Sequence, residues 1–299
     1  MLEAKSEWSH QSIHANGVRL HYVTDGEGPL MLFLHGFPEN WYSWRHQIRE
    51  FSKTHRVVAL DLRGYNDSDK PAGIFSYLTS EILKDVESVI RGLGYKSCIL
   101  VGHDLGGSIA WSFAYDYPGM VSCLIVLNAP HLALFMDKLR NPQQLARSWY
   151  IFFFQLPWLP ELALRACDYR IITGMFSGLA VNKQAFTQED LNVFKNAAAK
   201  PGALTAMLSY YRTILFSRIV RRKILEVSTI LIWGENDPLL GNDLTYLTER
   251  YVRDFEIKMI SNCSHWVQQE QPELVNEIIR NFIYEKIKTG DLSNPETIP

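Results

Sequence analysis

Short runs of valine, isoleucine and leucine recur along this chain and constrain its fold more than any other feature. They fall at residues 31–36, 57–64, 98–104, 123–130 and 229–237, with a weaker run at 256–265. Apolar runs of this length suit strands that are buried on both faces of a parallel sheet. An Asn16-Gly17 hairpin signal, followed by alternation over residues 18–23, precedes the series and adds two strands to it.

Helical segments separate these runs. Residues 80–93 carry apolar side chains at the spacing of one helix face, at positions 82, 83, 86, 89, 90 and 93. Thr79 is the expected N-cap of this helix, and Gly94 is the expected stop. Alternating strands and helices predict an α/β fold built on a mostly parallel, doubly wound sheet.

The alternation breaks after the sixth strand. From about residue 131 to 217 the pattern is helical only, and strands resume at 229. Pro142 after Asn141, Thr187 before Glu189 and Asp190, and Pro201-Gly202 mark helix starts or boundaries within this stretch. The sequence therefore predicts a core domain of residues 1–130 and 218–299, with a helical lid of residues 131–217 inserted into it.

Composition excludes several classes of protein. The net charge of −2 is spread over interspersed acids and bases, which argues against a nucleic-acid partner. Four cysteines lack paired spacing, and Cys98 and Cys123 lie in strand-like runs, so we expect core thiols without a disulfide framework or metal site. The first ten residues contain no apolar signal segment, and the apolar stretch 149–160 is too short to span a bilayer. We expect a cytoplasmic protein without metal or cofactor.

The fifth strand run ends in Gly102-His103-Asp104-Leu105-Gly106, the pattern of a nucleophile elbow. Small residues at 102 and 106 permit a tight turn from the strand into a helix expected to begin near Gly107. The turn projects side chain 104 toward the edge where ligands bind. An aspartate there needs no base for activation and can displace at an sp³ carbon to form an ester. The alternative reading, an ordinary aspartate N-cap, is weakened by the residues described next.

Two later strand ends supply partners for Asp104 in the order nucleophile, acid, histidine. Asp237 follows the strand run at 229–233, and His265 follows the run at 256–260. His265 would take a proton from water, and Asp237 would hold its tautomer. The alternative position for the acid holds the uncharged Asn128, and Glu235 precedes the turn, where we expect it to face solvent.

The loop after the first core strand contains His35-Gly36-Phe37-Pro38. Such a loop commonly provides one N–H of an oxyanion hole, and the residue after the nucleophile provides the other. We therefore assign these donors to the backbones of Phe37 and Leu105. His35 and His103 are expected to be structural.

Opening a strained ether would also require an acid for the departing oxygen, and phenols stay protonated at neutral pH. The lid offers Tyr150, Tyr169, Tyr210 and Tyr211, and spacing alone does not choose among them. Lid tyrosines are more often packing residues than acids. Adjacent helical residues project about 100° apart, so Tyr210 and Tyr211 are not both expected to face the pocket.

Together, the segments HGFPENWYSWRHQI, DLRGYNDSDKP, GHDLGG, NAPH, WGENDP and CSHWVQQEQPE resemble the soluble epoxide hydrolases of the α/β-hydrolase superfamily. The resemblance runs from about residue 10 to 287 and is strongest to a branch with vertebrate epoxide-hydrolase-4-like and bacterial members. It implies a doubly wound core, a helical lid, and hydrolysis of epoxides to diols through an ester on Asp104. It also implies that Tyr150, five residues before Gln155, and Tyr211, in a Tyr-Arg pair, bind the epoxide oxygen.

One departure concerns the pocket, because the family often has tryptophan where this chain has Leu105. Leu105 and Phe37 also argue against a haloalkane dehalogenase, which binds halide with a tryptophan and an asparagine or second tryptophan at such positions. A serine hydrolase is excluded by Asp104, and Leu105 and Ser108 do not suit a haloacetate dehalogenase, which needs arginines. A catalytically quiet ligand-binding protein remains the alternative from another class.

The expected partner is a small lipophilic epoxide, in a pocket lined by Phe37, Trp149, Phe153 and Trp266. The aromatic run 149–158 could also contact a membrane surface peripherally. A monomer and a homodimer are both compatible with the sequence.

Overall fold

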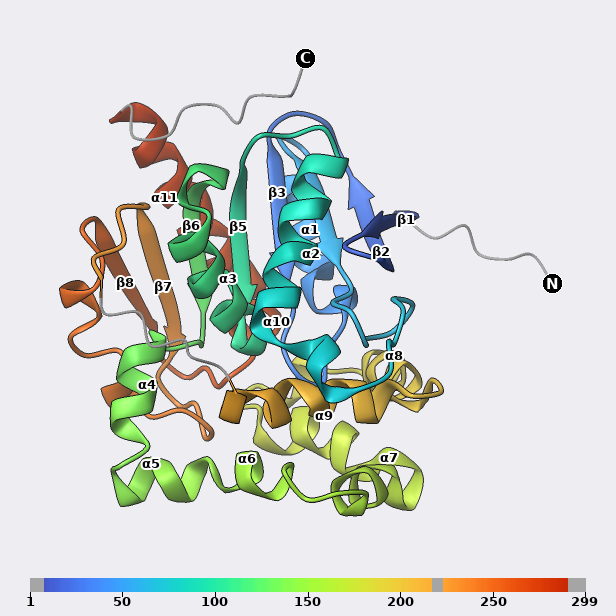
Figure 1. The fold of residues 1–299 in the computed structure, drawn as a ribbon. Helices are drawn as coiled ribbons and strands as arrows, with labels where there is room; N and C mark the ends of the chain where they lie inside the picture. Colours follow the sequence, from blue (N-terminus) through green and yellow to red (C-terminus); the bar gives the residue numbers. More distant parts are fainter. Residues whose placement is uncertain (1–7, 217–222, 290–299) are drawn as a thin grey trace.

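The computed structural model describes residues 8–216 and 223–289, which fold around an eight-stranded sheet (Figure 1). The strand order is β1-β2-β4-β3-β5-β6-β7-β8. The strands are β1 (Ser9–Ala15), β2 (Val18–Asp25), β3 (Leu30–Leu34), β4 (Arg56–Leu60), β5 (Cys98–His103), β6 (Val121–Leu127), β7 (Thr229–Gly234) and β8 (Phe255–Ile260).

Strands β3 to β8 are parallel to one another, whereas β2 is antiparallel to both β1 and β4. The β1–β2 hairpin turns at Asn16 and Gly17, whose φ angles of 46° and 78° are those of the expected two-residue turn. The mostly parallel, doubly wound sheet predicted from the apolar runs is therefore confirmed.

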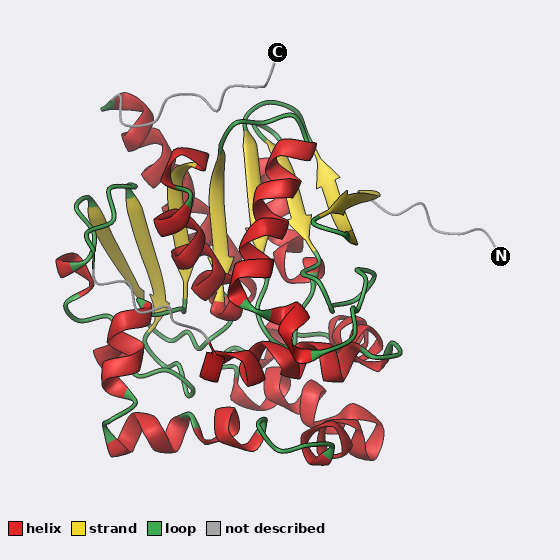
Figure 2. Cartoon of the chain, in the orientation of Figure 1, coloured by secondary structure: helices red, strands yellow, loops and turns green. Residues whose placement is uncertain are grey.

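Helices cover both faces of the sheet (Figure 2). Alternate residues of β5 face opposite sides, so Cys98 and Leu100 belong to one apolar cluster and Ile99 and Val101 to the other. The first cluster contains residues of α2 (Thr79–Gly92) and α3 (Asp104–Asp116), and the second contains residues of α1 (Arg45–Phe51) and α11 (Pro272–Lys288). Cys123 and Cys263 are also buried, and all four cysteines are free thiols.

The helix ends correct two details of the sequence prediction. Thr79 is not the N-cap of α2, because Leu78 holds that position and its carbonyl accepts from the N–H groups of Glu81 and Ile82. Gly94, with φ +86°, lies just beyond the C-cap Leu93, as the expected stop. Helix α3 begins at Asp104 and not near Gly107, because β5 passes into it without a connecting loop.

A helical insert follows β6 and lies at the ends toward which the parallel strands point (Figure 1). We call it the lid; its helices are α4 (Leu132–Lys138), α5 (Pro142–Arg147), α6 (Trp149–Phe153), α7 (Leu159–Leu179), α8 (Gln188–Ala199) and α9 (Ala203–Thr213). Asn141 caps α5, Thr187 and Asp190 form a capping box on α8, and Gly202 precedes α9, as expected. The predicted boundary between residues 217 and 218 lies outside the described residues, and the two-domain division stays a prediction.

Among the helices that the structure describes, none has the length and apolar composition needed to cross a bilayer. Several large apolar side chains of the lid are nevertheless exposed, including Trp149, Phe152 and Trp158. Peripheral contact of this segment with a membrane stays a prediction.

The turn from β5 into α3 generates a stability prediction. A Cβ at Gly106 would lie 2.2 Å from the backbone oxygen of Leu34, so Gly106→Ala should destabilise the fold by about 3 kcal/mol through forced displacement of backbone. Gly174→Ala is the control, because no atom lies within 4 Å of its added Cβ and alanine favours the helix by about 0.5–1 kcal/mol. Urea denaturation of both variants measures the difference. Equal midpoints would contradict the proposed close contact.

Candidate active site

The tight turn between β5 and α3 places Asp104 at the edge of the sheet. Its φ of +50° is unusual for a non-glycine residue and is a strained conformation. Backbone packs closely around it: a Cβ at Gly102 would lie 2.5 Å from the oxygen of Gly106, and one at Gly36 would lie 2.6 Å from Cβ of Asp104. These contacts explain why glycine occupies the positions on either side of the turn and in the facing loop.

Asp104, His265 and Asp237 converge from the ends of three strands. His265 Nε2 lies 3.6 Å from Asp104 Oδ1, and His265 Nδ1 lies 2.7 Å from Asp237 Oδ2. The histidine and Asp237 are buried. The sequence prediction of this group therefore corresponds to a single constellation in space, in the chain order expected for an elbow nucleophile.

Asp237 is held by more than the histidine. Its Oδ1 accepts from the N–H groups of Leu239 and Leu240, and its Oδ2 accepts from Nδ2 of Asn128 at 2.7 Å. Asn128 in turn accepts from the N–H of Gly234. An acid at position 128 would place a second negative charge beside Asp237, whereas the amide donates to it. Glu235 is exposed and binds Ser261, as expected for a residue outside the site.

Burial and charge act in opposite directions on these groups. Burial alone would lower the pKa of His265, but attraction to Asp237 and Asp104 and the hydrogen bond with Asp237 raise that pKa well above its usual range. Burial would likewise raise the pKa of Asp104, yet its contacts with His265, His103 and the Phe37 N–H lower it. These shifts favour an ionised Asp104 beside a protonated His265.

The loop after β3 contributes a backbone donor to the nucleophile. The N–H of Phe37 donates to Asp104 Oδ2 at 3.0 Å, which is the geometry expected of an oxyanion donor acting on this carboxyl group. The Leu105 side chain lines the cavity described below. The role of the Leu105 N–H as a second donor stays a prediction.

Behind the site lies a buried polar network that the sequence did not reveal. The carboxylate of Glu39 accepts from the Gly36 N–H and from Ser43, and lies 2.8 Å from Nδ1 of His103. The other ring nitrogen of His103 lies 2.9 Å from the backbone oxygen of His265. Glu39 thus connects the Phe37 loop with the histidine loop, and a single glutamate after a Gly-Phe-Pro turn carries no sequence signal of such a role.

His35 is likewise structural, as expected. Its Nδ1 lies 2.9 Å from the oxygen of Gly36, and its Nε2 accepts from the N–H of Leu62. Only one group of the described residues has a geometry that could hold a metal ion, namely His21, Asp61 and Asp67. Asp61 there is already bound by the Trp41 N–H and by Asn66, and the group lies outside the cavity lining.

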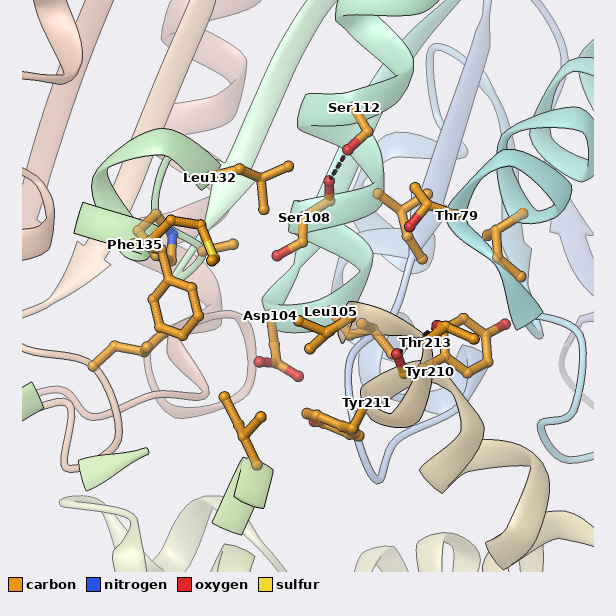
Figure 3. A pocket seen from close by; sticks show the side chains of 18 of the residues that line it. Thr79, Asp104, Leu105, Ser108, Ser112, Leu132, Phe135, Tyr210, Tyr211 and Thr213 are labelled. Atoms are coloured by element: carbon orange, nitrogen blue, oxygen red, sulfur yellow. Dashed lines mark hydrogen bonds between the residues drawn. The ribbon is translucent and has the colours of Figure 1, made fainter. Parts of the chain in front are cut away.

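A cavity of about 170 Å³ opens above Asp104, between the core and the lid (Figure 3). Its walls are mainly apolar and come from α2, α3, the segment after β6, α4, α6 and α9. The lining residues are Tyr77, Thr79, Ile82, Asp104, Leu105, Ser108, Ile109, Ser112, Asn128, Ala129, Pro130, Leu132, Phe135, Met136, Tyr150, Ile151, Tyr210, Tyr211, Thr213, Ile214 and Leu240.

Tyr150 and Tyr211 both border this cavity, with ring centroids 6.1 Å apart. Neither hydroxyl makes a hydrogen bond to any residue in the described part of the chain. Burial first, and then the charge of Asp104, raises the pKa of both phenols, so they are neutral donors. Gln155 fixes their relative position, because its amide binds the oxygens of Ile151 and Tyr211.

The other lid tyrosines differ from this pair. Tyr210 also borders the cavity, which contradicts the expectation that only one of two adjacent tyrosines would do so. Its hydroxyl donates to the backbone oxygen of Arg63, so this hydroxyl is already occupied by a bond to the core domain. Tyr169 lies at a kink of α7 with three consecutive left-handed residues and does not line the cavity.

The four predicted pocket residues are not among those that line the cavity. Trp149 is 61% exposed, because it lies on the solvent side of α6, one residue before Tyr150. Phe153 packs on Trp149 and Phe154, and Trp266 is buried against Phe176. Phe37 packs edge-on against Tyr211 and Phe154, so it supports the phenol ring from behind.

Comparison with known proteins gives consistent matches. Residues 29–272 match the family model described as alpha/beta hydrolase fold. The chain is 42% identical to epoxide hydrolase 4 of Homo sapiens over 287 residues, which cover 93% of this chain and 79% of the relative. It is 45% identical to epoxide hydrolase 3 of Xenopus tropicalis over 278 residues, covering 90% and 76%.

A solved structure gives a match of the same kind. A mutant of an epoxide hydrolase from Bacillus megaterium is 38% identical and superposes with a TM-score of 0.86, covering 92% of this chain and all of that chain. The family-model match spans every residue of the constellation around Asp104.

The contact between Asp104 and His265 generates a prediction about pKa. Asp104→Asn removes one of the two negative charges that raise the pKa of His265, so this pKa should fall. NMR titration of labelled histidine measures the shift, and mass spectrometry confirms that the introduced amide has not hydrolysed back to a carboxylate. His55, whose pKa is lowered by burial alone, is an internal reference that should not move. An unchanged His265 pKa would contradict the described coupling.

Proposed function

The chain belongs to the epoxide hydrolases of the α/β-hydrolase fold, and on this premise we propose that it converts lipophilic epoxides to vicinal diols through an ester on Asp104. One observation supports this mechanism above all others. An ionised aspartate at the elbow lies 3.6 Å from a buried histidine and lines the same cavity as two phenols whose hydroxyls have no hydrogen-bond partner among the described residues.

In the first step, an oxygen of Asp104 attacks an epoxide carbon, and the ring C–O bond breaks. The departing oxygen would leave poorly as a bare alkoxide, so a donor must supply it with a hydrogen bond or a proton. Tyr150 and Tyr211 have neutral hydroxyls and line the same cavity as Asp104. The product of this step is an alkyl ester with a free hydroxyl group on the neighbouring carbon.

In the second step, the ester is hydrolysed. Ester formation removes the negative charge of Asp104, which is one of the groups that raise the pKa of His265. The proton that His265 then loses restores the phenol that protonated the departing oxygen. The neutral histidine acts as a base toward water, while Asp237 holds Nδ1 and stabilises the imidazolium that forms. Water attacks the ester carbonyl, the Phe37 N–H stabilises the oxyanion, and the diol leaves with Asp104 restored.

The same alkyl-enzyme chemistry in a haloalkane dehalogenase would need donors for a halide. The Leu105 side chain on the cavity wall offers no donor to a halide, whereas the two phenols on the wall can donate to an oxygen. A ligand-binding protein without turnover would have no use for the His265–Asp237 pair. We therefore favour epoxide hydrolysis over both alternatives.

The apolar cavity wall supports a lipophilic substrate with an aromatic or alkyl arm. One solved relative, the Bacillus megaterium epoxide hydrolase, was captured with a naphthyloxy-propanediol product. We propose aryl epoxides of this general type as the first substrates to try.

Measurement of diol release from aryl and alkyl epoxides tests the reaction class. 1-Bromobutane and p-nitrophenyl acetate, the substrates of a dehalogenase and an esterase, are assayed alongside them. Bromide or nitrophenol release without diol would refute it.

His265→Gln should trap the ester. Attack by Asp104 needs no base, whereas hydrolysis needs His265, so the variant should consume about one equivalent of epoxide, release little diol and gain the mass of the epoxide. Intact-protein mass spectrometry and peptide mapping locate the adduct, with Asp104→Ala as the matched control that should form none. An adduct on another residue would exclude Asp104 as the nucleophile.

Tyr150→Phe and Tyr211→Phe should each slow ester formation by about ten- to a hundredfold, because the other phenol still donates, and the double variant should lose nearly all activity. Tyr210→Phe is the matched control: its hydroxyl binds Arg63, so it should cost stability of about 1 kcal/mol and change the rate far less. Single-turnover kinetics measure the chemical step. Equal rates in all three single variants would disprove the assignment.

A further inference from the structure

One face of α3 forms a continuous wall of the cavity. Asp104, Leu105, Ser108, Ile109 and Ser112 all line it, at the spacing of a single helix face. Ser108 therefore lies one turn beyond Asp104, which corresponds to a rise of about 6 Å along the helix. Figure 3 shows its hydroxyl directed into the open space above Asp104, in the cavity that Leu132 and Phe135 also line.

Most polar groups of the wall already have partners. The hydroxyls of Tyr77, Tyr210, Ser112 and Thr213 each donate to a backbone oxygen, and Thr79 also has an interaction partner. The amide of Asn128 is bound on both sides, by Asp237 and Gly234.

Ser108 is different from these residues. Its backbone oxygen accepts from Ser112, but its own hydroxyl makes no hydrogen bond to any residue in the ranges 8–216 and 223–289. Its side chain is partly accessible and lies among apolar neighbours on the cavity wall. Besides Asp104 and the phenols of Tyr150 and Tyr211, it is thus a polar group of the wall left free to bind a ligand.

From this placement we propose that Ser108 binds an oxygen of the substrate, so that the site prefers epoxides carrying an ether or hydroxyl oxygen next to the ring over their hydrocarbon analogues. This inference rests on the proposed function, because it assumes that Asp104 attacks an epoxide carbon. In a glycidyl ether, the ether oxygen lies about 3.5–4 Å from the terminal ring carbon.

The distances are compatible with simultaneous attack and binding. A carbon about 3–3.5 Å from the attacking oxygen of Asp104 would leave the ether oxygen about one helical turn along α3, at the level of Ser108. The epoxide oxygen then points the other way, toward the lid phenols. Ser108 would therefore recognise the arm of the substrate and not the reacting ring.

The test uses two nearly isosteric substrates, phenyl glycidyl ether and 2-(2-phenylethyl)oxirane, which differ by an oxygen in place of a methylene. The measured quantity is the ratio of their kcat/KM values in each variant. Comparing this ratio between wild type and Ser108→Ala cancels the intrinsic reactivity difference of the two epoxides. We expect Ser108→Ala to lower the ratio by about three- to tenfold, as for the loss of one hydrogen bond between neutral groups.

Ser112→Ala is the matched control, because that residue lies on the same helix face but its hydroxyl is committed to Ser108. It should leave the ratio unchanged. An unchanged ratio in Ser108→Ala, or an equal change in both variants, would overturn the inference while leaving the proposed function intact. If wild type hydrolysed neither epoxide, the proposed function itself would fail, and this inference would fail with it.

Discussion

Close backbone packing around the β5–α3 turn is the constraint on which the rest of the site depends. The loop after β3, the end of β5 and the start of α3 meet where Gly36, Gly102 and Gly106 leave no room for a side chain. This packing holds Asp104 in a left-handed conformation that costs of order 1–3 kcal/mol, and keeps the Phe37 N–H at 3.0 Å from its carboxylate. The nucleophile and its backbone donor are therefore positioned by the core before any substrate binds.

A second constraint is electrostatic. Two carboxylates, Asp104 and Asp237, lie on either side of His265 in a buried position, where charges interact more strongly than in water. In the proposed mechanism, formation of the ester would neutralise Asp104, so that the same three side chains favour an imidazolium before ester formation and a neutral histidine base after it. The neutral Asn128 preserves this balance, since it binds Asp237 without adding charge. Glu39 places a further negative charge behind the site, where its carboxylate contacts the ring of His103.

The sequence predicted those parts of the structure that depend on strand ends. Asp104, Asp237 and His265 follow buried apolar runs, and the parallel sheet alone brings such positions to one edge. The choice of Tyr150 and Tyr211 among four lid tyrosines rested on resemblance. The orientation of lid side chains was predicted poorly, as Trp149 shows, because α5 and α6 span only 6 and 5 residues and helical periodicity has too few repeats to define a face. Glu39 could not be found because the partner that links it to the site, His103, comes from a distant segment.

The division between core and lid follows from the geometry of displacement at carbon. Attack must come from the side opposite the departing oxygen, so the nucleophile and the oxygen donors have to lie on opposite sides of the substrate. Asp104 belongs to the core, whereas Tyr150 and Tyr211 lie on α6 and α9 of the lid, joined by Gln155. The rest of the substrate must then extend away from the line between Asp104 and the phenols. The cavity wall formed by α3 and the segment after β6 is available for it. In the proposed mechanism, reactivity depends on Asp104 and the lid phenols on opposite sides of the epoxide, whereas selectivity would depend on cavity side chains such as Ser108 and Leu105.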